Sequence, residues 1–396
     1  MTPSHSHRAR DGLGGSPPGV RIALACLLIP LVAATVFGVV VLWPSEAEVR
    51  APQGFAVERA HGEITDLHRC DDPEAPPECV AASVRLSEGP DAPDTVEASL
   101  AFGDQAPTFE VGDRVVLGYR ANAPMDERYS FIDFDRSRPL LLLAGLFVVG
   151  VLILSRLRGL GSLAGLGISL LVIIFFTLPA LLAGTAPLAV ATVTASAIMI
   201  VTLYLAHGLS ARTSVALVGT LVALVLAGAL GAVFTTVGHF TGYMDENVQF
   251  LSMFGGEIDM RGLLLAGLVI GALGVLDDVT VTQASAMWEL AAANPYTSRP
   301  SLFAQGMRIG RAHVSSTVNT LVLAYVGASL PLMLLFAAAE VTFRDAVGTE
   351  MVGQEVVRAL VGSLGIIAAV PVTTAIAAIV AGSMAGRVRR ARQRAG

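Results

Sequence analysis

Residues 262–283 read GLLLAGLVIGALGVLDDVTVTQ, an apolar run that carries two adjacent aspartates near its end. A helix of about 20 apolar residues spans the hydrocarbon core of a bilayer, so this run predicts a transmembrane helix. A carboxylate inside such a helix costs about 2.5–3.5 kcal/mol on insertion scales. Asp277 and Asp278 therefore require a role beyond packing.

The composition of the whole chain agrees with a membrane protein. Of the 396 residues, 54% are apolar, 15% are charged and 40 are glycine, and the formal net charge is −6. Soluble domains average about 25% charged residues and about 7% glycine. These values exclude an ordinary soluble enzyme, a disordered chain and a coiled coil. The acidic balance argues against a nucleic-acid partner, which requires a basic surface.

Seven further apolar runs accompany the first one, so we predict an α-helical polytopic membrane protein in contact with the lipid bilayer. The shortest run has about the minimum length that can still cross a bilayer. The eight predicted transmembrane helices cover residues 22–43, 139–154, 160–183, 186–206, 213–237, 262–283, 312–339 and 356–382.

The distribution of arginine predicts the orientation of these helices. The segments on one side of the predicted membrane carry Arg8, Arg10, Arg21, Arg156, Arg158, Arg212, Arg299, Arg308, Arg311 and the arginines between residues 387 and 394. The loops on the other side carry mostly acidic residues. The positive-inside rule then places both termini in the cytoplasm. The first run is longer than the apolar core of a signal peptide, although Ser45-Glu46-Ala47 loosely resembles a cleavage site.

The segment between the first two predicted spans is the one soluble stretch of domain size. Short alternating runs occur at 83–86, 95–100 and 114–119, with turn residues between them. This pattern predicts a small antiparallel β domain, OB-like or SH3-like. The predicted organisation is a cytoplasmic tail (1–21), a first helix (22–43), an extracytoplasmic β domain (44–138), a seven-helix membrane domain (139–384) and a basic cytoplasmic tail (385–396).

Cys70 and Cys79 are the two cysteines of the β domain, and eight residues separate them. Outside the cytoplasm such a pair forms a disulfide, so we predict a Cys70–Cys79 bond. A metal site is the alternative, because the surrounding stretch is rich in potential ligands, but its spacing does not match a zinc site. These residues are His61, His68, Cys70, Asp71, Asp72, Glu74, Glu78 and Cys79.

The aspartate pair is the candidate functional site of the membrane domain. It lies roughly 23 Å along its helix, within the cytoplasmic third of the predicted span. Hydroxyl and carboxylate oxygens suit Na⁺ or a divalent cation, and two adjacent carboxylates also suit a proton. The predicted ion- or substrate-binding residues are Asp277, Asp278, Thr280, Thr282, Gln283, His313 and Asn319.

Structural explanations of these residues remain open at this point. Asp278 could cap a helix that restarts at Val279. His313 and Asn319 could serve as hydrogen-bonding contacts between helices. The sequence contains no His-Glu-x-x-His motif and no phosphate-binding glycine loop with lysine, so we expect no enzyme and no bound cofactor.

Three stretches carry a resemblance to a known family. GVLDDVTVTQAS at residues 274–285 is similar to the signature stretch of the YibE/F-like family of bacterial membrane proteins. FEVGDRVVL at 109–117 and YSFIDFDR at 129–136 resemble the segment that precedes the second span in that family. The resemblance covers about residues 50–385. It implies a multi-pass protein of the bacterial inner membrane and implies no particular reaction or substrate.

The predicted spans, the aspartate pair and the β domain are compatible with two functions from different classes. The first is a secondary transporter or permease of an ion or small solute, with the aspartate pair in a site linked to H⁺, Na⁺ or a divalent cation. The second is a non-transporting envelope protein whose β domain binds a peptide, a protein or a cell-wall component.

Overall fold

The computed structural model describes residues 18–44, 58–69, 79–100, 107–124, 128–244, 246–252 and 258–395. The chain forms two compact units. The helical unit consists of Met1–Val49 and Ser155–Gly396, and the barrel unit consists of Arg50–Leu154.

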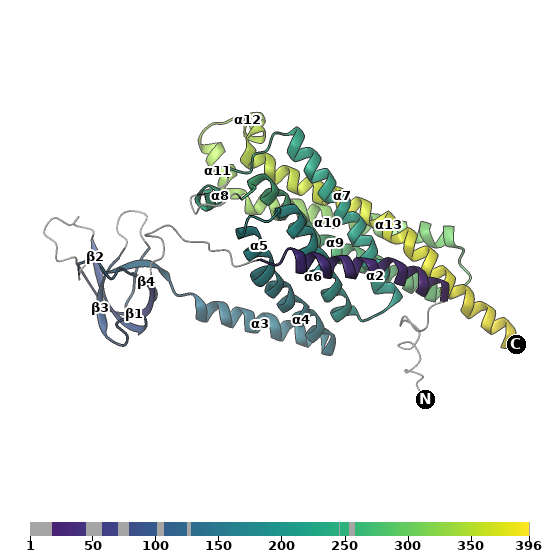
Figure 1. Ribbon diagram of the computed structural model, residues 1–396, viewed down its shortest axis with the longest axis horizontal. Helices are drawn as coiled ribbons and strands as arrows, with labels where there is room; N and C mark the ends of the chain where they lie inside the picture. The colour runs from purple at the N-terminus through teal and green to yellow at the C-terminus, as the bar shows by residue number, and fades with distance from the viewer. Residues whose placement is uncertain are drawn as a thin grey trace. The chain divides into compact units, whose positions relative to one another are not determined.

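Five strands of the barrel unit close into a barrel in the order β1-β2-β3-β5-β4 (Figure 1). They are β1 (Glu58–Arg69), β2 (Val80–Glu88), β3 (Thr95–Ser99), β4 (Arg114–Tyr119) and β5 (Tyr129–Phe134). β1 pairs antiparallel with both β2 and β4, whereas β3 pairs parallel with β5. This insertion of β5 between β3 and β4 is the Greek-key order of an OB-like barrel, and not that of an SH3-like one.

The barrel interior follows from the alternation of apolar side chains along each strand. Ile64, Val84 and Leu117 are almost fully buried in it. Tyr129 is also buried, and its hydroxyl donates a hydrogen bond of 2.8 Å to the carboxylate of Asp91. Burial and this hydrogen bond raise the pKa of the Tyr129 phenol, which therefore stays neutral and acts as the donor.

Asp135 joins the last strand of the barrel to α3 (Ser137–Ser155). Its carboxylate accepts hydrogen bonds from the Ser137 hydroxyl at 2.5 Å and from the Ser137 backbone N–H at 3.0 Å. It also pairs with Arg114 of β4 at 3.0 Å. These contacts hold the pKa of Asp135 below its usual range, so the charged carboxylate caps the start of α3.

The helical unit is built around α9 (Met260–Ala293), which packs against α7, α13, α6 and α10 (Figure 1). The remaining helices surround this group or connect its members. The other elements are α2 (Pro18–Val41), α4 (Leu157–Val172), η2 (Ile173–Thr177), α5 (Leu178–Leu182), α6 (Pro187–His207), α7 (Ala211–Val237), α8 (Glu246–Ser252), α10 (Arg299–Ala328), α11 (Leu330–Ala338), α12 (Phe343–Gly348) and α13 (Glu350–Ala395).

Seven helices in the described part of the chain are long and apolar enough to cross a membrane. They coincide with seven of the eight predicted spans: Pro18–Val41, Ser137–Ser155, Gly159–Leu182, Pro187–His207, Ala211–Val237, Met260–Ala293 and Glu350–Ser383. The remaining predicted span falls on α10 and α11, which are bent by 57° relative to each other. Pro331 explains this break, because it lacks the N–H that a continuous helix would direct to the carbonyl of Gly327.

Close helix packing depends on glycines at particular positions. A Cβ at Gly306 of α10 would lie 2.8 Å from the Thr374 side chain of α13 and would overlap the sulfur of Met287 in α9. A Cβ at Gly310 would lie 3.0 Å from the amide oxygen of Gln283. By contrast, a Cβ at Gly274 would meet no atom within 4 Å. Gly306 and Gly310 therefore allow α10 to approach both α9 and α13.

We expect Gly306→Ala to destabilise the helical unit by about 1–3 kcal/mol, because the added methyl group overpacks the contact of three helices. The matched substitution Gly274→Ala should leave stability unchanged or raise it by up to about 1 kcal/mol, because the methyl group enters open space and alanine favours the helix interior. Apparent melting temperatures of the two purified variants in detergent would test this difference. Equal melting temperatures would contradict the proposed packing role of Gly306.

The predicted disulfide falls partly within the described residues. Cys79 is disulfide-bonded, and Cys26 is free and exposed. Cys70 lies outside the described residues, so its pairing with Cys79 stays a prediction.

We expect mass mapping of the non-reduced protein to recover a peptide that joins Cys70 to Cys79, with Cys26 alone open to alkylation. Closing a loop of this length stabilises a fold by about 2.5–3 kcal/mol in the chain-entropy model. The double substitution Cys70→Ser and Cys79→Ser should therefore make the barrel strands more sensitive to limited proteolysis. Alkylation of all three cysteines in the non-reduced protein would exclude the bond.

Candidate functional site

α9 carries the aspartate pair through the interior of the helical unit without interruption. The helix begins at Met260, where the side chain of Asp259 accepts a hydrogen bond from the backbone N–H of Gly262, and it continues to Ala293. The structural alternative in which Asp278 caps a helix that restarts at Val279 is therefore wrong, because the backbone at this point is helical on both sides.

The two aspartates occupy different environments. Asp277 is half-buried, and its Oδ1 atom is shielded from solvent and has no hydrogen-bond partner among the described residues. Asp278 is exposed. Neighbouring residues of an α-helix point about 100° apart, so one carboxylate enters the packed interior while the other leaves it. Of the predicted pair, Asp277 is the residue with an unmet interaction inside the bundle.

Thr280 connects this region to α7. Its hydroxyl lies 2.5 Å from the hydroxyl of Thr220, and it donates a hydrogen bond of 3.1 Å to the backbone carbonyl of Asp277. Both threonines are fully buried. With the Thr280 proton directed to Asp277, the single proton of Thr220 is donated to Thr280, and the carbonyl of Ala216 at 3.0 Å is an alternative acceptor for it. This pair of hydroxyls is satisfied within the protein.

Gln283 connects α9 to two further helices. Its side-chain amide donates hydrogen bonds to the backbone carbonyl of Gly306 in α10, at 3.0 Å, and to the hydroxyl of Thr374 in α13, at 2.7 Å. The Thr374 hydroxyl donates in turn to the carbonyl of Val370. Both donors of the amide are thus used in contacts between helices. This geometry favours a positioning role for Gln283 over direct ligand binding.

His313 lies on α10, and its Nε2 atom is buried without a hydrogen-bond partner in the described part of the chain. α10 contacts α9 at two places: Gln283 meets Gly306, and the hydroxyl of Tyr325 approaches Gly271. His313 lies between these contacts along α10, and no hydrogen bond joins it to Asp277. Asn319 lies further along α10 and is exposed.

One face of α9 is open although most of the helix is buried. The positions on this face are three or four residues apart in most cases, and they carry small or polar side chains. They are Gly267, Gly271, Gly274, Asp278, Thr282 and Glu289, all of which are exposed. At 1.5 Å per residue this face extends about 33 Å, the thickness of a hydrocarbon core.

The structure adds polar residues that the sequence analysis did not single out. Thr220 and Thr374 complete the contacts of Thr280 and Gln283. The hydroxyl of Thr373 is buried without a partner among the described residues. In α13, Arg358 pairs with Glu355 at 2.7 Å inside a membrane-capable helix. The sequence could have pointed to these residues, because polar and charged side chains inside a membrane span are costly. Arg358 and the threonines all lie within apolar runs.

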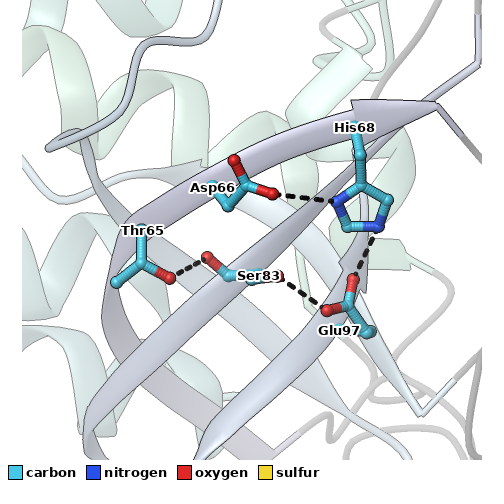
Figure 2. Close-up of polar contacts among 5 residues, drawn as sticks. All are labelled: Thr65, Asp66, His68, Ser83 and Glu97. Atoms are coloured by element: carbon cyan, nitrogen blue, oxygen red, sulfur yellow. Dashed lines mark hydrogen bonds and ion pairs between the residues drawn. The ribbon is translucent and has the colours of Figure 1, made fainter.

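The barrel unit presents a polar network on β1, β2 and β3 (Figure 2). The imidazole of His68 lies 3.0 Å from Glu97 and 3.9 Å from Asp66, while the Ser83 hydroxyl donates to Glu97 at 2.7 Å. No cluster of three or more His, Cys, Asp and Glu in the described ranges could hold a metal ion. Most ligands of the alternative metal site, from Cys70 to Glu78, lie outside those ranges.

The apolar helices and their internal polar contacts define a multi-pass helical membrane protein with a separate β-barrel unit. A family model described as YibE/F-like protein matches residues 143–383. The chain belongs to this family. The matched range contains the aspartate pair and excludes the barrel strands. No curated protein and no solved structure matches the chain.

We expect Gln283→Leu to lower the stability of the helical unit by about 1–3 kcal/mol, because the Gly306 carbonyl and the Thr374 hydroxyl lose a buried donor. The matched control is Thr282→Val, which replaces an exposed neighbour on the same helix and should have little effect. Thermal unfolding in detergent distinguishes the two variants. A melting temperature of Gln283→Leu equal to that of the wild type would show that the amide does not hold the helices together.

Proposed function

We propose that this protein is a secondary transporter or permease of an ion or small solute, with Asp277 as its proton- or cation-binding carboxylate. The observation that carries the proposal is the buried Oδ1 atom of Asp277, which has no partner among the described residues. The unpartnered Nε2 atom of His313 on α10 is a second buried ionisable group without a partner among the described residues.

Burying the Asp277 carboxylate without a partner is costly. An unsatisfied donor or acceptor costs about 1–3 kcal/mol, and a charged group costs more. Helix packing satisfies the neighbouring Thr280 and Gln283, so the same bundle is able to pair buried groups. A carboxylate oxygen left unpaired next to them is best explained by a ligand. A proton or a hard cation such as Na⁺, Mg²⁺ or Ca²⁺ provides the missing interaction.

The open face of α9 also supports an ion site at Asp277. Ionisable residues inside membrane segments almost always face the interior of a bundle or a water-filled cavity. Asp278 and Thr282 are exposed on this face, and the glycines beside them leave open space. A water-filled route along α9 would hydrate Asp278 and lead to Asp277. In this arrangement Asp278 helps the ion to reach Asp277, and Asp277 binds it.

The proposed topology completes this assignment. Eight spans, with the bent α10–α11 pair as one of them, place both termini in the cytoplasm and the barrel unit outside it by the positive-inside rule. The membrane is then the inner membrane of a bacterium. We propose no resident cofactor for transport. Hydroxyl oxygens of Thr280 and Thr282 and the side chains of His313 and Asn319 remain candidate ligands beside the carboxylates.

We expect Asp277→Asn to reduce ion flux at least tenfold, because the amide cannot carry the charge that binds a proton or cation. Asp278→Asn should reduce it less. The assay uses the full chain in vesicles loaded with a pH-sensitive dye, with imposed gradients of Na⁺, K⁺, Mg²⁺ or Ca²⁺. The matched control is Glu289→Gln, an exposed carboxylate on the same face of α9.

Two outcomes would overturn the proposal. One is wild-type vesicles that show no ion-dependent pH change above protein-free vesicles under any of the four gradients. The other is a folded Asp277→Asn variant with wild-type flux. Either result would favour the alternative function, in which the barrel unit binds an envelope component and the helices serve as its anchor.

A further inference from the structure

One face of α10 is exposed on the side opposite to its contacts with the bundle. Gly310 lies against Gln283 of α9 and Val370 of α13. Asn319 follows nine residues later, and at about 100° per residue it points about 180° away from Gly310. The exposed face carries small and polar residues and one leucine. Its members are Ala312, Ser315, Ser316, Asn319 and Leu323.

The polar side chains on this face have no partner in the described part of the chain. Two neighbouring residues, Thr317 and Thr320, donate to backbone carbonyls of their own helix at 2.9 and 3.0 Å. The side chains of Ser315, Ser316 and Asn319 make no hydrogen bond with another described residue. An amide has two donor hydrogens and an acceptor oxygen, so Asn319 has the largest unmet requirement of the three.

This requirement falls within the membrane if α10 and α11 form one span. Asn319 is seven residues past residue 312, where the predicted span begins, and thus about 10 Å inside it. The hydrocarbon core holds no water to satisfy an amide. Polar side chains of membrane helices form hydrogen bonds across to other helices. The exposed face of α10 therefore has the chemistry of a contact with a further helix.

This face is complementary to a second copy of itself. Two copies inserted in the same orientation are related by a two-fold axis along the membrane normal, so each residue on the axis meets its own copy. Amides and hydroxyls both donate and accept, so Asn319 and Ser315 are able to pair with their copies. All five residues of the face are uncharged, and the symmetry therefore brings no like charges together.

The open face of α9 lacks this property, because a two-fold contact there would bring Asp278 against its own copy. On α10 the nearest exposed charges are Arg308 and Arg311, which precede the predicted span. They lie about 17 and 12 Å from Asn319 along the helix axis. Two helices that cross at about 20–40° diverge over this distance, so the arginines of the two copies stay apart.

We propose that this protein forms a dimer in the membrane through the exposed face of α10, with the two Asn319 amides hydrogen-bonded to each other. The small side chains of Ala312 and Ser315 allow the close approach of the two helices. The inference rests on the proposed topology, in which α10 crosses the membrane, and not on transport. It gives Asn319 a partner in the second copy, so His313 is the candidate ligand of the ion site that α10 supplies.

The first test crosslinks the full-length protein in membranes through single cysteines placed in a Cys26→Ser background. With a short thiol-specific crosslinker, Ala312→Cys and Ser315→Cys should each give at least fivefold more covalent dimer than Val225→Cys. Val225 of α7 is 69% exposed and is the control for random collisions. Equal crosslinking at the three positions would overturn the proposal.

The second test measures association of the labelled full chain in vesicles by single-molecule photobleaching over a series of lipid dilutions. Asn319→Leu should lower the association constant at least fivefold, because the paired amides are lost. Asn319→Gln keeps an amide and should stay within threefold of the wild type. Thr320→Val is the matched control, because its hydroxyl is bonded to its own helix. A wild type that is monomeric at every dilution, or wild-type association of Asn319→Leu, would contradict the contact.

A water-filled space is the competing explanation of the exposed face. In open membrane fragments, Ser315→Cys should react with a charged thiol reagent at least tenfold more slowly than Ala292→Cys, an exposed position beyond the predicted span. Equal rates would show that water covers the face and would overturn the proposal. The double variant Asp277→Asn with Ser315→Cys should crosslink like Ser315→Cys alone, so failure of the dimer is distinguishable from failure of the transport proposal.

Discussion

The amide of Gln283 joins three helices at one point, and the packing of the membrane part depends on this contact. Its two donors reach the carbonyl of Gly306 in α10 and the hydroxyl of Thr374 in α13. Water is absent from the core of a bilayer, so a buried amide must find its partners within the protein. Gly306 and Gly310 have no side chains, and the three backbones can therefore come close enough for these bonds.

The same constraint separates structural from functional polar groups in this bundle. Thr220, Thr280, Gln283 and Thr374 are buried and paired with one another or with backbone carbonyls. Asp277 and His313 each retain a buried atom without a partner among the described residues. In the described part of the helical unit, Thr373 and Trp288 also retain an unpaired buried atom, so Asp277 and His313 are distinguished by being ionisable. Asp277 is the centre of the proposed ion site, and His313 on α10 is a candidate ligand.

The break between α10 and α11 has a different physical origin from the polar contacts. Pro331 removes one backbone donor, and the two helices bend by 57°. The bend leaves a cavity beside α13, and Glu355 borders it. The charged pair Glu355–Arg358 then lies at the edge of this cavity and away from the aspartates. The helical unit thus holds two polar regions, one at the carboxylate of Asp277 and one at an ion pair beside an apolar space.

Sequence alone was sufficient where the controlling property is local. Hydropathy and length predicted seven helices that the structure confirms, because the cost of burying polar groups in lipid acts on each segment separately. Alternation of side chains predicted the β unit for a similar reason. The desolvation cost of carboxylates directed attention to Asp277 and Asp278. Only the tertiary structure decided the OB-like strand order, the burial of Asp277 rather than Asp278, the bridging role of Gln283 and the pairing of Glu355 with Arg358 beside a cavity. These features depend on which helices and strands become neighbours, as when residue 283 meets residue 374, and no local pattern records that choice.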